Sequence, residues 1–180
     1  MAVLVALVAL ILLVPLVAMQ FSDEWNWDLF DFAFAGTLLF GVGLTYELVA
    51  NKGGTVAYRA AVGVAVATAL VLVWVNAAVG IIGHDDDFNL MYFGVLGVGI
   101  IGALVARLRP QGMAHALVAM AIAQMLVPLI VLAIPNLRAW EPPGPIGVFI
   151  LNGFFALLWI GSAWLFRKAV RDQILTNATA

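Results

Sequence analysis

The chain has 180 residues, of which 65% are hydrophobic and only 10% are charged, and its mean hydropathy is +1.11. A soluble domain is about 45–50% apolar and about 25% charged, so this composition excludes a water-soluble domain and predicts an integral membrane protein. The chain contains no cysteine, which excludes disulfides, thiolate metal ligands, iron–sulfur ligation and a cysteine nucleophile.

Six apolar runs of nearly membrane-spanning length follow one another along the chain. A transmembrane helix needs about 20 apolar residues, so residues 1–180 are expected to form a single integral membrane domain with no room for a soluble one. Continuous runs of this length favour helices over a β-barrel, whose strands alternate over about ten residues. The sequence therefore predicts an all-α, polytopic transmembrane bundle of six helices. They are expected at residues 1–19, 29–50, 58–83, 90–108, 114–134 and 146–166.

Basic and acidic residues alternate between the two ends of these predicted helices. If the N-terminus is cytoplasmic, seven of the eight basic residues fall inside and only Arg138 falls outside. Most acidic residues fall on the opposite side. Because cytoplasmic loops of membrane proteins are enriched in Lys and Arg, this distribution predicts that both termini are cytoplasmic. The seven inner residues are Lys52, Arg59, Arg107, Arg109, Arg167, Lys168 and Arg171.

The first run can also be interpreted as a cleaved signal peptide. It has no positively charged start, and Val17-Ala18-Met19 is a poor cleavage site, so a retained helix is the favoured interpretation. Cleavage would leave five helices with the N-terminus outside and would not change the orientation of the others.

Four of the neutral polar side chains inside the predicted spans are candidates for a binding site, namely Thr37, Asn76, Gln124 and Asn152. Burying polar groups in lipid is costly, so each needs a partner or a function. One interpretation is a ligand-binding pocket in the outer half of the bundle, where Pro128 leaves the backbone carbonyl of Gln124 without its helical donor. The other interpretation, which is favoured because four such side chains are ordinary in six helices, is interhelical hydrogen bonding that fixes the packing.

Glu47 lies inside an apolar run, about one turn from the predicted cytoplasmic end of the second helix. A carboxylate in a membrane span is a candidate for a proton or ion path. This one is shallow enough to reach the interface, so pairing with Arg59 or Arg107 is the favoured interpretation.

Acidic residues and one histidine also lie in two predicted outer loops. Asp23, Glu24, His84 and Asp85 offer carboxylate and imidazole ligands for a weak divalent-cation site at the membrane rim. The spacing matches no calcium-binding loop. A solvated acidic cap that reinforces the orientation is therefore the favoured alternative.

Small residues recur at four-residue spacing on several predicted helices, including Gly99 with Ala103 and Gly102 with Ala106. This spacing lets helix backbones approach closely. It indicates either a compact bundle or a dimer face on the fourth predicted helix. The second alternative would make the protein a homo-oligomer or part of a larger membrane complex.

Residues 19–24 (MQFSDE) and 74–83 (WVNAAVGIIG) resemble segments of a family of small, uncharacterised bacterial inner-membrane proteins. The resemblance extends over most of the chain. It implies a multi-pass location in the bacterial inner membrane and carries no active site, substrate or cofactor to this sequence.

These observations predict a non-enzymatic membrane protein, either an accessory subunit or a binder of lipid or another apolar small molecule. The alternative is a transporter or channel for a small solute or ion, with Glu47 and the four polar side chains along its path. No nucleophile, base and orienting group come together in the sequence, so an enzyme is not expected. We also expect no cofactor, because His84 and His115 are predicted at opposite faces and no nucleotide fingerprint is present. Membrane lipids are the expected partners, and nucleic acid is not.

Overall fold

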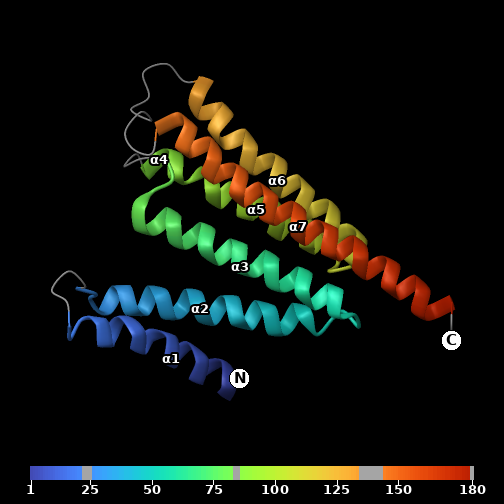
Figure 1. Cartoon of the computed structure of the whole chain (residues 1–180), viewed down its shortest axis with the longest axis horizontal. Coiled ribbons are helices and arrows are strands. Elements are labelled where there is room, and N and C mark those ends of the chain that lie inside the picture. Colours follow the sequence, from blue (N-terminus) through green and yellow to red (C-terminus); the bar gives the residue numbers. More distant parts are fainter. Residues whose placement is uncertain (22–25, 83–85, 134–143, 179–180) are drawn as a thin grey trace. The chain divides into compact units, whose positions relative to one another are not determined.

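The structure is a computed structural model that describes residues 1–21, 26–82, 86–133 and 144–178. Each of the six apolar runs coincides with one of six longer helices, which confirms the predicted all-α architecture for this part of the chain. The helices are α1 (Ala2–Ala18), α2 (Leu29–Ala50), α3 (Val56–Val79), the one-turn α4 (Asp86–Asn89), α5 (Met91–Ala106), α6 (Pro110–Ala133) and α7 (Gly144–Ala178) (Figure 1).

Four of these helices, α2, α3, α6 and α7, are long and apolar enough to cross a membrane. The other two long helices, α1 and α5, are apolar but have only 17 and 16 residues. At about 1.5 Å per residue, a 16-residue helix covers about 24 Å, less than the roughly 30 Å of a bilayer hydrocarbon core. The structure thus supports four candidate spans among the described residues, and six spans stay a prediction.

The largest difference from the predicted boundaries concerns α7, which continues past residue 166 to Ala178. This added segment carries Arg167, Lys168 and Arg171, so the hydropathy signal ends before the helix does. Helix α3 also differs from its predicted bounds, because it ends at Val79 and not at residue 83. Gly80 follows it with a positive φ of 66°, a conformation that glycine adopts without steric cost and that ends the helix.

The described chain divides into two compact units, Met1–Leu48 and Val49–Ala180, and each is described by itself. In the first unit, α1 packs against α2 at a glycine, because a methyl group placed on Gly43 would collide with the side chain of Leu4. The absence of a side chain there lets the two helices approach. A single domain over the whole chain stays a prediction.

The second unit is built from α3, α5, α6 and α7 around an apolar core. Helix α7 packs along both α6 and α3, and α5 packs along α6 (Figure 1). The rings of Tyr58 on α3 and Phe166 on α7 meet edge to face, with centroids 5.1 Å apart. The largest fully buried aromatic side chains are Trp159, Tyr58, Tyr92, Phe155 and Phe166.

Helices α5 and α6 are in close contact at small residues. A methyl group placed on Gly102 would lie 2.5 Å from Cβ of Ala116 and 3.2 Å from its Cα, and one placed on Gly112 would lie 2.6 Å from Cβ of Ala106. These contacts bring the two backbones together within one chain. Gly102 and Ala106 therefore pack as the compact-bundle interpretation requires.

Candidate functional site

Two of the four polar side chains predicted as a site, Gln124 and Asn152, meet in the core of the second unit. Both are 0% exposed, and Nε2 of Gln124 on α6 donates to Oδ1 of Asn152 on α7 at 2.9 Å. Nδ2 of Asn152 donates to the Tyr92 hydroxyl on α5 at 3.0 Å and to the Val148 carbonyl at 2.8 Å. Nε1 of Trp159 donates to Oε1 of Gln124 at 3.4 Å. This amide network links α5, α6 and α7.

Every side-chain nitrogen and oxygen of the two amides has a partner in the amide network. With 0% exposure, neither amide borders a space that admits a water molecule. The arrangement is that of interhelical packing, in which polar side chains bond across helices. A solute path past Gln124 would require the amide network to open.

Tyr92 and Trp159 were not predicted as partners of the two amides. The sequence could have indicated such partners, because each buried amide needs a hydrogen-bond partner on a neighbouring helix. Tyrosine and tryptophan are the apolar-bodied side chains that carry a hydrogen-bonding group into a core. Both residues are 1% exposed.

Asn76 and Thr37 do not belong to the amide network. Thr37 is exposed on α2 in the first unit. Nδ2 of Asn76 donates to the backbone carbonyl of Asn89 at 3.2 Å, and Oδ1 of Asn89 accepts from the backbone N–H groups of Ile81 and Ile82 at 2.9 and 3.0 Å. The two asparagines therefore fasten the end of α3 to the segment that leads into α5.

A void between α3 and α5 adjoins Asn76, whose buried Oδ1 has no hydrogen-bond partner among the described residues. Leu72, Tyr92 and Leu96 are among the residues that line it. The void is too narrow for a water molecule. It therefore offers no room for a ligand beside Asn76.

Glu47 lies on α2 in the first unit, where its Oε1 is 3.8 Å from the N-terminal ammonium of Met1. The side chain of Glu47 is 47% exposed, and at such exposure an ion pair contributes little to stability. The predicted pairing with Arg59 or Arg107 would join the two units and stays a prediction.

The predicted cation site lies outside the described residues, because Asp23, Glu24, His84 and Asp85 all fall in the segments that the structure does not describe. Within the described ranges, no three histidine or acidic side chains come together in a way that could hold a metal ion. The metal site therefore stays a prediction.

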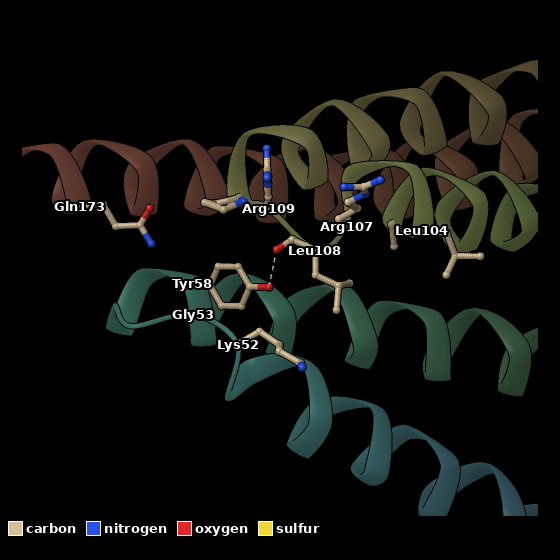
Figure 2. Close-up of a pocket in the computed structure, with 10 residues that line it drawn as sticks. Lys52, Gly53, Tyr58, Leu104, Arg107, Leu108, Arg109 and Gln173 are labelled. Carbon is tan, nitrogen blue, oxygen red and sulfur yellow. Dashed lines mark hydrogen bonds between the residues drawn. The ribbon is translucent and has the colours of Figure 1, made fainter.

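A hollow that the sequence did not predict lies where α3 begins and where α5 ends and α6 begins (Figure 2). Its volume is about 500 Å³. Apolar carbons from α5 and from the start of α6 form much of its wall, and Gln173 of α7 borders it. The residues that line it include Lys52, Tyr58, Leu104, Arg107, Arg109 and Gln173.

The turn between α5 and α6 forms one side of this hollow. Arg107 and Leu108 both have left-handed backbone conformations, with φ of 50° and 58°, which costs a non-glycine residue about 1–2 kcal/mol. The Leu108 N–H donates to the Ala103 carbonyl at 3.2 Å, and the Leu108 carbonyl accepts from the Tyr58 hydroxyl at 2.8 Å (Figure 2). Because Tyr58 is buried in the core, it holds the turn from α3.

Three exposed cationic residues line the hollow. Lys52 approaches from the connection between α2 and α3, whereas Arg107 and Arg109 come from the opposite side (Figure 2). No carboxylate of the part of the chain that the structure describes lies within 4 Å of these three cations. Unneutralised cations around a concave surface create a positive potential that attracts anions.

The chain matches no protein-family model, no curated protein and no solved structure. The bacterial inner-membrane location implied by the resemblance accordingly stays a prediction.

Proposed function

We propose that the protein is a non-enzymatic, multi-pass integral membrane protein of the bacterial inner membrane that binds a membrane lipid or a similar apolar molecule. The observation that carries this proposal is the hollow of about 500 Å³ in the second unit. Ligand pockets are typically about 300–1,000 Å³, mostly apolar, with a few polar groups that orient the ligand. A hollow with apolar walls and a basic rim suits a molecule with an apolar tail and a polar head.

The charges of the second unit support an orientation with this hollow at the cytoplasmic membrane border. Lys52, Arg107 and Arg109 line it, and the charged last part of α7 reaches it through Gln173. Arg59 lies on the first turn of α3, beside the same end. The positive-inside rule assigns such a basic end to the cytoplasm, which agrees with both termini being cytoplasmic.

The buried polar groups contribute to helix packing. The hydroxyl of Ser162 on α7 is 0% exposed and donates to the Ala61 carbonyl of α3 at 2.7 Å. A nucleophilic serine instead donates its proton to a base. Ser162 therefore joins two helices, as Gln124 and Asn152 do.

Native mass spectrometry of the full chain, purified from bacterial inner membranes in a mild detergent, tests the proposal. We expect bound lipid that survives a detergent wash. Leu104→Trp should reduce it, because the 72% exposed Leu104 lines the hollow and a larger ring would occupy that space. Leu157→Trp is the matched control, since Leu157 is a 69% exposed leucine on α7 that does not line the hollow. Absence of retained lipid, or equal losses in both variants, would refute the proposal.

A further inference from the structure

We propose that the hollow binds the phosphate group of an anionic phospholipid through Lys52, Arg107 and Arg109. This inference rests on the proposed lipid-binding function and deepens it, because it names the headgroup and the side chains that select it. Neither side of the hollow supplies all three cations. The site therefore depends on how the α2–α3 connection and the α5–α6 turn come together.

The two kinds of cation have complementary roles toward a phosphate. An arginine guanidinium presents a planar fork that matches two phosphate oxygens, and a lysine ammonium acts as a compact point charge. Arg107 and Arg109 border one side of the hollow and Lys52 the other. In Figure 2 both guanidinium groups point away from Lys52, so the two exposed arginine side chains turn towards a phosphate when it binds. None of the three is neutralised by a carboxylate of the described chain.

The α5–α6 turn is held in place before any ligand arrives. The Tyr58 hydroxyl bonds to the carbonyl of Leu108, the residue between the two arginines. Because the backbone of the turn is already fixed, only the side chains lose conformational entropy when a ligand binds. Helix α6 begins at Pro110, beside these arginines, and the free N–H groups of a first helical turn add partial positive charge.

A phosphate could be carried by a lipid or by a small soluble molecule, and the surroundings favour the lipid. Leu104 lines the hollow and is 72% exposed, on a helix whose outer face is apolar. A phospholipid can place its headgroup between the cations and its chains along this face. A soluble phosphate would contact the cations and leave the apolar wall exposed.

The test compares phosphatidylglycerol with phosphatidylcholine on the full chain in lipid nanodiscs, followed by native mass spectrometry. Each basic residue near an anionic lipid surface contributes about five-fold in binding. Lys52→Gln/Arg107→Gln/Arg109→Gln should therefore lower phosphatidylglycerol retention more than ten-fold and leave phosphatidylcholine retention unchanged. The control is Arg167→Gln/Lys168→Gln/Arg171→Gln, which removes the same charge from exposed positions of α7 that do not line the hollow. Its loss of retention measures the general attraction of basic residues to an anionic surface, and the hollow triple variant should lose more than this control.

The possible outcomes separate this inference from the proposed function. Equal loss in both triple variants, or none in either, would overturn the assigned cations while leaving lipid binding intact. Binding of soluble glycerol phosphate without any retained lipid would overturn both proposals. If the hollow triple variant fails to fold, Lys52→Gln alone should still reduce phosphatidylglycerol retention about five-fold and more than Lys168→Gln does, and equal values for the two single variants would overturn the inference.

Discussion

Replacing Asn152 by alanine tests whether the amide network holds the helices of the second unit together. Asn152 makes two hydrogen bonds to other helices, to Gln124 on α6 and to Tyr92 on α5. Its third bond, to the Val148 carbonyl, lies within α7. The substitution removes all three and leaves the Nε2 group of Gln124 without an acceptor at 0% exposure.

The expected cost follows from these contacts. Interhelical hydrogen bonds in membrane proteins average about 0.6 kcal/mol and reach about 1.7 kcal/mol, so two contribute about 1.2 kcal/mol. Leaving a buried donor unsatisfied adds about 1 kcal/mol or more. We therefore expect Asn152→Ala to lower the free energy of unfolding by about 2 kcal/mol. Asn76→Ala is the matched control and should cost about 0.6 kcal/mol, because Asn76 donates one bond, to the Asn89 carbonyl.

The assay is reversible unfolding in mixed detergent micelles, followed by tryptophan fluorescence, on Gln124→Ala, Asn152→Ala and the double variant. Because the two amides bond directly, the double variant should be less destabilised than the sum of the single variants by at least about 0.5 kcal/mol. Additive costs would refute direct coupling. Equal losses of unfolding free energy for Asn152→Ala and Asn76→Ala would refute the expectation that the larger number of hydrogen bonds at Asn152 makes its loss the greater one.

Two further substitutions test the close helix approach and the turn. Gly102→Ala should cost about 1–3 kcal/mol of unfolding free energy, because the new methyl group meets Ala116 at 2.5 Å. Gly97→Ala, where nothing lies within 4 Å of the new carbon, should be neutral or stabilise by up to about 1 kcal/mol; equal effects would contradict the packing. Arg107→Gly should raise the unfolding free energy by about 1 kcal/mol, because glycine relieves the left-handed strain, while phosphatidylglycerol retention falls about five-fold. A lower unfolding free energy would contradict this, because it would show that contacts of the Arg107 side chain stabilise the turn by more than the left-handed backbone costs.

The helices were predictable because lipid offers no hydrogen-bond partners to the backbone, so each apolar run must satisfy its own backbone groups as a helix. The second run, at residues 29–50, was predicted with the bounds that α2 has. The end of α7 was not predictable in the same way. The helix continues through Arg167 and Lys168. These residues are charged, so the hydropathy falls there although the chain is still helical.

The candidate sites were predictable only in part. Gln124 and Asn152 were expected to approach each other because polar groups in lipid need partners, but hydropathy does not show which aromatic side chain faces them. The hollow was missed because Lys52 and Arg107 lie far apart in the sequence and were interpreted as charges that set orientation. Positive φ at Arg107 and Leu108 also carries no sequence signal, since glycine is the residue expected there.

The amide network also determines the relative register of α6 and α7. Leucine, valine and alanine surfaces pack against one another in several longitudinal offsets, because apolar contacts are not directional. A shift of either helix by one turn moves its side chains by about 5.4 Å, which is beyond hydrogen-bonding distance. It would separate Gln124 from Asn152 and leave both unsatisfied in the core. A pair of amides thus distinguishes one alignment of two largely apolar helices from its neighbours, as a single buried polar residue does in coiled coils.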